Sequence, residues 1–293
     1  MDWIRSIWNK TLVFLEMIKW EHSVFALPFA YLGLFLAERG LPPVPLIFKI
    51  TLAMVAFRTM AMGLNRILDA GIDAKNPRTS SRALPSKKLK LSFVWLLTVV
   101  MFFLFEVSAY WLSPLCFYLS PVPVFLALLY PLMKRFTWCS HFILGIILGI
   151  APYGAWIASR GGFSWIPGFL TLGITCWVAG FDIIYSLQDV EFDRQEGLYS
   201  FPSRFGVPAS LKMTAWLHLV TLLFWSAAGT LAGLGWIYWG GMAAGALFLL
   251  REHWLIRTCG IKMIQEAFFS MNALISFSVF VMTLLDLSVR RTF

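Results

Sequence analysis

Two pairs of aspartates with the same spacing occur at separate places in the sequence and could together hold a metal ion. Asp69 and Asp73 stand four residues apart, and so do Asp189 and Asp193. In a helix, residues at i and i+4 lie on one face about one turn apart, where like charges repel each other. A divalent cation would compensate that repulsion. Mg²⁺ prefers oxygen ligands and binds through one or two carboxylates plus substrate phosphate oxygens, so the sequence predicts a magnesium–diphosphate site.

Further polar side chains precede both pairs at helical spacing and extend the same two faces. They are Arg58, Asn65, Asp182 and Tyr185. An ionisable residue inside an apolar segment, such as Arg58 or Asp182, is costly in a membrane and normally faces a polar interior. Two polar stripes on separate helices that end on the same membrane side therefore predict one shared polar cavity.

Cations near both pairs could take up the charge of a bound phosphate group. The candidates are Arg58, Lys75, Arg78, Arg82, Lys134, Arg135, Arg194 and Arg204. The segment 66–90 is predicted to be a loop whose seven lysines and arginines are mostly topology charges. Within it, Lys87, Lys88 and Lys90 are expected to be solvated residues that keep the loop in the cytoplasm.

The elements that position these residues follow from the composition. Of 293 residues, 59% are hydrophobic and 13% are charged, against about 45–50% and about 25% in an ordinary soluble domain. The apolar runs are continuous rather than alternating, which predicts an all-α, polytopic membrane bundle and excludes a β-barrel. The net charge of +9 fits membrane topology and anionic ligands better than nucleic acid. Four scattered cysteines indicate neither a disulfide framework nor a zinc site.

About 20 apolar residues are needed to cross a bilayer, and we expect about nine such spans. They cover residues 23–38, 45–65, 91–112, 114–132, 139–159, 166–187, 211–233, 235–250 and 268–288. These spans make residues 23–293 a single transmembrane domain. Residues 1–22 mix charged and apolar side chains, show no signal-peptide cleavage pattern, and predict an amphipathic helix at the membrane interface.

Most of the 24 lysines and arginines fall in alternate connections between the spans. The positive-inside rule makes that side cytoplasmic. The N-terminus is then inside, and an odd number of spans puts the C-terminus outside. We expect the protein to lie in the cell inner membrane, with its cavity open to the cytoplasm. Two GxxxG spacings, at 145–149 and 241–245, predict close helix packing.

At the acidic pairs the sequence resembles the UbiA superfamily of membrane prenyltransferases. The family motif NxxxDxxxD is matched by Asn65, Asp69 and Asp73, and its second motif, DxxxD, by Asp189 and Asp193. The segments NRILDAGIDAKNPRTSSRALP, YSLQDVEFDRQEGLYS, EHSVFALPFA and YPLMKRFT look most like the branch that prenylates aromatic acids. That branch comprises the 4-hydroxybenzoate polyprenyltransferases and their menaquinone-pathway relatives.

The resemblance implies a Mg²⁺-dependent membrane enzyme that transfers a polyprenyl group from polyprenyl diphosphate to an aromatic acid and releases diphosphate. The acid would be 4-hydroxybenzoate or a hydroxynaphthoate, in ubiquinone or menaquinone biosynthesis. The two motifs would hold the metal and the diphosphate. Arg58, Lys134, Tyr130 and Tyr185 would surround the same cavity, and Arg78 and Arg82 would reach the phosphate. Tail length, acceptor ring and oligomeric state stay open.

Two individual roles also stay open. Arg135 either binds the carboxylate of the acceptor or is a topology charge in a short loop. Asp182 orients an acceptor hydroxyl, serves as a base, or pairs with Arg58 or another cation.

Two other classes of membrane protein are alternatives to this function. A secondary transporter would use intramembrane arginine and aspartate as a substrate path, often at helices broken near the bilayer midplane. The acidic pairs lie instead at the ends of spans and continue into polar loops. A CDP-alcohol phosphotransferase would carry a single Asp-rich signature, whereas this sequence has two separate acidic segments.

Overall fold

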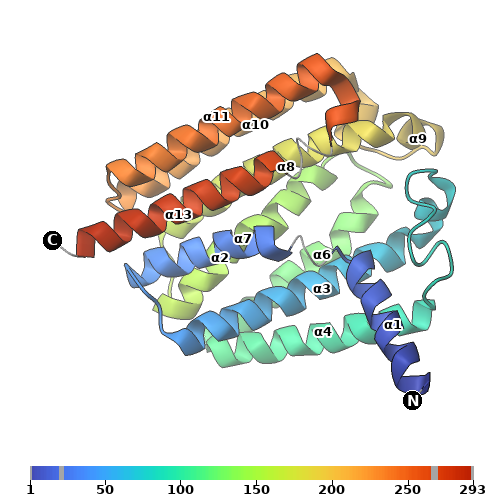
Figure 1. Ribbon diagram of the computed structural model, residues 1–293, viewed down its shortest axis with the longest axis horizontal. Coiled ribbons are helices and arrows are strands. Elements are labelled where there is room, and N and C mark those ends of the chain that lie inside the picture. Colours follow the sequence, from blue (N-terminus) through green and yellow to red (C-terminus); the bar gives the residue numbers. More distant parts are fainter. Residues whose placement is uncertain (1, 20–22, 265–269, 292–293) are drawn as a thin grey trace.

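The structure is a computed structural model that describes residues 2–19, 23–264 and 270–291. All regular secondary structure within these ranges is helical, as the sequence predicts. Parts of two expected segments, residues 1 and 20–22 of the N-terminal helix and 268–269 of the last span, lie outside the described residues. The long helices run alongside one another as a bundle, and α1 is inclined to them at one end (Figure 1).

The helices have the following bounds: α1 Asp2–Met17, α2 Ser23–Glu38, α3 Val44–Lys75, α4 Leu91–Leu112, α5 Pro114–Leu119, α6 Pro121–Met133, α7 Ser140–Arg160, α8 Trp165–Ser186, α9 Val190–Gln195, α10 Phe201–Leu231, α11 Trp236–Cys259 and α13 Asn272–Arg291. Two short 3₁₀ turns, η2 Leu187–Asp189 and η3 Gly260–Met263, follow α8 and α11.

Seven helical segments in the described ranges are long and apolar enough to cross a membrane. They are Val44–Lys75, Leu91–Leu112, Pro114–Met133, Ser140–Arg160, Trp165–Gln195, Phe201–Leu231 and Asn272–Arg290. Two expected spans are not among them. The expected span 23–38 corresponds to α2, whose apolar part Leu27–Glu38 is shorter than the seven spanning segments. The expected span 235–250 corresponds to α11, which is less apolar because polar residues occupy its C-terminal turns. The protein is therefore an integral membrane bundle, while nine crossings remain a prediction.

Helix α3 is longer than the sequence predicts. The expected span 45–65 continues as helix to Lys75, so the residues from 66 to 75 are not part of a loop. The helix ends at Asn76, whose N–H donates to the Ile72 carbonyl. The following residue is Pro77, and a residue before proline disfavours the helical conformation. The first aspartate pair therefore lies on a rigid helix rather than on a mobile connection.

Helix α8 is the central helix of the bundle. In the apolar segment that contains α8, 61% of the residues are buried inside the bundle, whereas at most 33% are buried in each of the other six spanning segments. It packs on α7 through the first GxxxG spacing: a Cβ on Gly145 would lie 2.3 Å from the Thr175 carbonyl oxygen, and one on Gly149 2.7 Å from the Thr171 carbonyl oxygen. The glycines thus allow the backbones of α7 and α8 to approach, as expected for this spacing.

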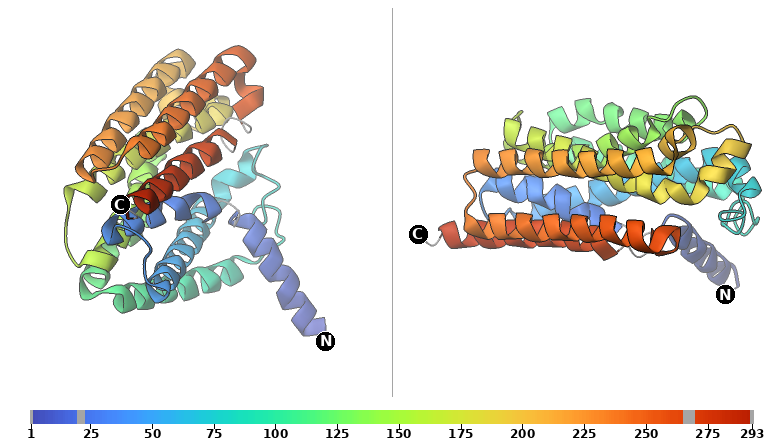
Figure 2. Two further views of the ribbon diagram at one scale, coloured as in Figure 1. Left: turned by 60° about the vertical axis from the view of Figure 1, so that its left-hand side comes forward. Right: turned by 90° about the horizontal axis from the view of Figure 1, so that it is seen from above.

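Both acidic segments lie at the same end of the bundle. The C-terminal end of α3, the connection that follows it, and α9 come together there, while α13 runs away from them to the opposite end (Figure 2). This arrangement places the two aspartate pairs on one side of the molecule. Which side of the membrane that end occupies remains a prediction.

Candidate functional site

The two aspartate pairs meet through the segment that follows the first of them. Asn76 donates from Nδ2 to Asp189 Oδ1 at 2.9 Å. Arg78 donates to the same carboxylate twice, from Nε to Oδ1 at 2.9 Å and from Nη2 to Oδ2 at 2.5 Å. The end of α3 is therefore bound directly to η2, and residues more than a hundred positions apart form one cluster.

Three of the four aspartates are paired with a cation. Lys134 Nζ lies 2.6 Å from Asp69 Oδ2, and Arg82 Nη1 donates to both oxygens of Asp73 at 2.7 and 2.8 Å. Asp69 and Asp73 are only 4% and 5% exposed. Such charges are stable away from water only when they are paired and hydrogen-bonded. These contacts explain how the repulsion between the aspartates is offset.

The remaining members of both motifs lie in the same cluster. Asn65 donates from Nδ2 to Asp69 Oδ2 at 3.3 Å, and Asp193 accepts a hydrogen bond of 2.7 Å from the Ser200 hydroxyl. The Arg78 guanidinium lies 5.4 Å from the centre of the Tyr185 ring, a cation–π distance. Burial opposes the charge of Arg78, but the hydrogen bonds and negative charge of Asp189 outweigh it and raise the pKa of Arg78 above its ordinary value.

The donor set suits a hard divalent cation. Among the described residues no three side chains of His, Cys, Asp or Glu converge closely enough to hold a metal ion by themselves. The site nevertheless offers carboxylate and amide oxygens, and Asp69 Oδ1 is a buried oxygen without a hydrogen-bond partner. Mg²⁺ commonly uses one or two carboxylates and completes its shell with water and phosphate oxygens. The residues therefore fit Mg²⁺ bound together with a phosphate-bearing substrate.

Asp182 pairs with His141, a partner that the sequence did not indicate. His141 Nδ1 lies 2.6 Å from Asp182 Oδ2, and the backbone N–H of Phe201 donates to His141 Nε2 at 3.3 Å. Because Nε2 accepts a hydrogen bond, Nδ1 carries the proton and donates it to Asp182. The structure thus gives Asp182 a histidine partner that was not among the alternatives above. Its roles toward the acceptor stay predictions. The spacing of residues within α7 or within α8 does not indicate that His141 and Asp182 are in contact.

Two predicted cations contact backbone carbonyls. Arg58 donates to the carbonyls of Ile18 and Lys19, at 3.4 and 3.0 Å, where α1 ends. Arg135 Nη2 donates to the Leu68 carbonyl at 2.7 Å, beside the first aspartate of α3. Arg135 therefore lies next to the aspartates of α3, whereas Arg58 lies against the end of α1, and their roles toward the substrates stay predictions.

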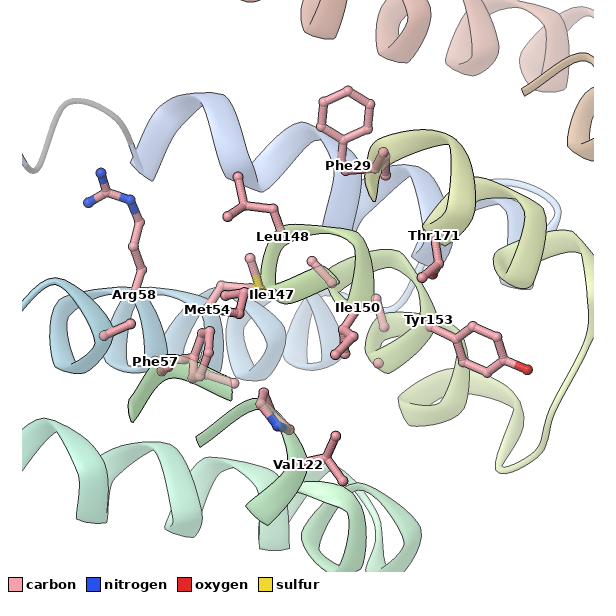
Figure 3. Close-up of a pocket in the computed structure, with 18 of the residues that line it drawn as sticks. Phe29, Met54, Phe57, Arg58, Val122, Ile147, Leu148, Ile150, Tyr153 and Thr171 are labelled. Carbon is pink, nitrogen blue, oxygen red and sulfur yellow. The ribbon is translucent and has the colours of Figure 1, made fainter. Parts of the chain in front are cut away.

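A cavity of about 520 Å³ begins at this end and extends between the helices. Arg58, Asn65 and Tyr130 line one end, and Tyr153 and Phe163 line the other. Figure 3 shows Arg58 and Tyr153 at opposite ends, with apolar side chains from α3 and α7 between them. The cavity is thus mostly apolar, whereas a polar one was expected. The reason is that, of the two polar stripes, only Arg58 and Asn65 line the cavity, whereas most of the other lining residues are apolar.

Arg66 belongs to the cluster and was missed as a site residue. The sequence prediction placed it in a loop of topology charges, but it lies on α3, three residues before Asp69 and seven before Asp73. Its Nε donates to the Met17 carbonyl at 3.2 Å. The helical spacing of 3 and 7 could have identified it, had the helix been extended beyond residue 65.

A second polar cluster, also missed, lies between α10 and α11. His218 Nδ1 is 3.0 Å from His253 Nε2 and 3.8 Å from Glu252 Oε2. Glu252 is fully buried. Gly180 of α8 provides the space for this cluster, because a Cβ there would lie 2.5 Å from His218 Nε2. The cluster packs α10 against α8 and α11.

The sequence matches known proteins over most of its length. The model of the UbiA prenyltransferase family matches residues 26–274. The 4-hydroxybenzoate octaprenyltransferase of Francisella tularensis subsp. novicida (strain U112) is 30% identical over 258 residues, 87% of this chain and 89% of the relative. The enzyme of the same name from Vibrio vulnificus (strain CMCP6) is 30% identical over 245 residues, 82% and 84% of the two chains.

Solved structures share the fold. The apo structure of a UbiA homolog from Aeropyrum pernix K1 superposes with a TM-score of 0.83 at 31% identity, covering 91% of this chain and 98% of the homolog. A UbiA homolog from Archaeoglobus fulgidus bound to DMAPP and Mg²⁺ gives a TM-score of 0.70 at 18% identity, covering 94% and 99%. The second likeness shows the fold alone.

Proposed function

Because the chain belongs to the UbiA prenyltransferase family, we propose that it transfers a polyprenyl group from a polyprenyl diphosphate to an aromatic acid of the 4-hydroxybenzoate type. The observation that carries this proposal is a cluster of four aspartates with their cations beside the end of an apolar cavity. The names of relatives at about 30% identity favour hydroxybenzoate over a hydroxynaphthoate. The transporter considered above is set aside, since the family is one of transferases.

The proposed setting is quinone biosynthesis at a cell inner membrane. The aspartate end would face the cytoplasm, with the N-terminus inside and the C-terminus outside. The distribution of lysine and arginine supports this orientation, and so does the course of α13 away from the aspartate cluster. A cytoplasmic site would receive a water-soluble aromatic acid directly, while the prenyl donor arrives from the bilayer.

Binding of the donor would redistribute the charges of the cluster. Asn65, Asp69, Asp73, Asp189 and Asp193 would hold Mg²⁺, which acts as a Lewis acid that stabilises the departing diphosphate. Arg78, Arg82 and Lys134 now contact carboxylates, and their long side chains would turn toward phosphate oxygens. Charge-assisted bonds from Arg and Lys to phosphate are among the stronger hydrogen bonds in proteins. The prenyl tail would enter the apolar cavity.

Transfer would break the bond between C1 of the prenyl group and the diphosphate oxygen, and form a bond from C1 to a ring carbon. Positive charge develops at C1, and the rings of Tyr130 and Tyr185 are the aromatic faces available to stabilise it. The ring carbon would then give its proton to the released diphosphate, which restores the aromatic ring. Asp182, which His141 holds by a hydrogen bond, is the carboxylate proposed to orient the acceptor hydroxyl. Arg135 is the cation proposed for the acceptor carboxylate. Burial among apolar helices would exclude water from the cation.

The test is a transfer assay with purified, detergent-solubilised protein, Mg²⁺, a polyprenyl diphosphate and a panel of aromatic acids that includes 4-hydroxybenzoate and dihydroxynaphthoates. We expect prenylated 4-hydroxybenzoate and released diphosphate, measured by mass spectrometry. Both products should disappear when EDTA removes the metal and return when Mg²⁺ is added in excess. A well-folded protein that prenylates none of the acids would contradict the proposal, and prenylation of naphthoates alone would contradict the acceptor assignment.

A further inference from the structure

We propose that Arg66 is a further residue that binds the diphosphate group of the donor, an inference that rests on the function proposed above. Neither the sequence motifs nor the cation pairs of the site assign a role to this residue. Its position on α3, its unused hydrogen-bond donors and its charge environment each support the assignment.

Arg66 lies on the face of α3 that carries the aspartates. It precedes Asp73 by seven residues, or about two helical turns, so the two side chains lie on nearly the same stripe. Asp69 is three residues away and also close to that stripe. The side chain is half-buried, and both aspartates as well as Tyr185 of α8 act on its charge. Arg66 therefore lies close enough to both aspartates of α3 and to Tyr185 for their charges to act on it.

The Arg66 guanidinium makes fewer hydrogen bonds than it has donors. Its Nε donates to the Met17 carbonyl at 3.2 Å, and this is the single hydrogen bond of Arg66 within residues 2–19, 23–264 and 270–291. A guanidinium has five N–H donors in a planar fork that suits two oxygens of a phosphate or carboxylate. The two Nη groups of Arg66 thus remain for an anionic ligand.

The charge of Arg66 also lacks a direct partner. Four neighbouring cations each contact a carboxylate: Lys134 contacts Asp69, Arg82 contacts Asp73, Arg78 contacts Asp189 and Lys75 contacts Glu196. Arg66 forms no such ion pair with any part of the chain that the structure describes. A half-buried cation without a paired anion is unfavourable. Arg66, like Arg135 beside Asp69, is therefore a cation of the cluster that contacts a backbone carbonyl rather than a carboxylate.

Diphosphate suits this position better than the carboxylate of the acceptor. Arg66 does not line the apolar cavity in which the prenyl tail and the acceptor ring would lie. It lies instead near Arg82, whose charge repels it, and an anion between the two arginines would relieve that repulsion. A diphosphate held by the aspartates through Mg²⁺ would bring phosphate oxygens to this place, and arginine binds such oxygens in pairs.

The test compares Arg66→Gln and Arg66→Lys with the wild-type enzyme. We expect Arg66→Gln to raise the KM for polyprenyl diphosphate and the inhibition constant of inorganic diphosphate, both measured with Mg²⁺, by about 10- to 100-fold, the range for one lost charge-assisted bond. Arg66→Lys keeps the charge but loses the fork, and should show a smaller increase. The KM for the aromatic acid should stay within about 2-fold, since Arg66 does not contact the acceptor.

Arg160→Gln is the matched control. Arg160 also donates from Nε to a backbone carbonyl of another helix, that of Ala37 at 2.6 Å, but at the opposite end of the bundle. The Arg160→Gln variant should keep the wild-type KM for polyprenyl diphosphate and the wild-type inhibition constant of inorganic diphosphate, even if its midpoint of thermal unfolding falls. This control separates loss of a tether between helices from loss of ligand binding.

Two results would overturn the assignment. One is an Arg66→Gln enzyme that melts earlier but keeps its donor KM and its inhibition by inorganic diphosphate, which would make Arg66 a tether for α1. The other is an increase in the KM for the aromatic acid alone. Calorimetric titration of inorganic diphosphate with Mg²⁺ into the same variants requires no acceptor, so it tests Arg66 even if the proposed acceptor is wrong. If Arg66→Gln does not fold, an unchanged diphosphate affinity in Arg66→Lys contradicts the proposal.

Discussion

Replacing Asp69 by asparagine is expected to lower prenyl transfer by at least about 1,000-fold in kcat/KM while the protein stays folded in the membrane. Asparagine has nearly the same size but no charge, so it would weaken the binding of Mg²⁺ and leave Lys134, now 2.6 Å from Asp69, without its counterion. A loss of about 4 kcal/mol of transition-state stabilisation corresponds to this factor, and a metal that acts as a Lewis acid contributes several kcal/mol. The rate of product formation at saturating Mg²⁺ measures the effect.

Asp286→Asn is the matched control for this variant. Asp286 is also buried and paired with a cation, Arg290 at 3.1 Å, but it lies at the other end of the bundle. There it accepts from the N–H of Gly235. We expect a lower unfolding temperature with retained activity below that temperature. Wild-type activity in Asp69→Asn would remove Asp69 from the metal site.

Asp189→Asn should have an effect of similar size for an additional reason. Asp189 accepts hydrogen bonds from both Asn76 and Arg78, so it joins the segment after α3 to η2. Loss of its charge would weaken metal binding and also release Arg78. We therefore expect a fall of about 100- to 1,000-fold in kcat/KM together with a raised KM for the donor. Steady-state kinetics with varied polyprenyl diphosphate separates the fall in kcat from the rise in the KM for the donor.

Glu191→Gln provides the comparison within the same segment. Glu191 is an exposed carboxylate two residues from Asp189, and its removal should change the rate less than about 2-fold. The double variant Asp69→Asn with Asp189→Asn adds a test of whether the two segments act as one unit. Residues that act together show strongly non-additive effects, so we expect the double variant to be little slower than Asp69→Asn. A fully multiplicative loss would indicate two independent sites.

The helical architecture and the cluster of aspartates followed from the sequence, because both depend on local patterns. Continuous apolar runs of about 20 residues specify membrane helices wherever they occur. The four-residue spacing of Asp69 and Asp73, and of Asp189 and Asp193, specifies one face of a helix. The prediction holds for the first pair, since Asp69 and Asp73 both lie near the end of α3. It is wrong for the second pair, because α8 ends at Ser186 and Asp189 lies in η2 while Asp193 lies in α9. The two acidic segments nevertheless meet in the structure.

Other features depend on contacts between helices, which leave no pattern in a single segment. The bond from His141 to Asp182 joins α7 and α8, and neither residue predicts the other. The apolar lining of the cavity results from how residues of eight helices pack, those from α2 to α8 and α13, although each polar stripe alone suggested a polar interior. Helix α3 is longer than predicted because the charged residues after position 65 continue the helix instead of ending it. Charged residues continue a helix readily when it leaves the membrane, and Pro77 was the better signal.

The most direct measurement of the central claim is an experimental structure of the protein with Mg²⁺ and a thiodiphosphate analogue of the polyprenyl donor, which binds but transfers its prenyl group slowly. The account predicts metal density between the analogue's diphosphate and the carboxylates of both acidic segments, with the tail in the cavity between Arg58 and Tyr153. A diphosphate bound away from the aspartates, or held by only one of the two segments, would contradict it.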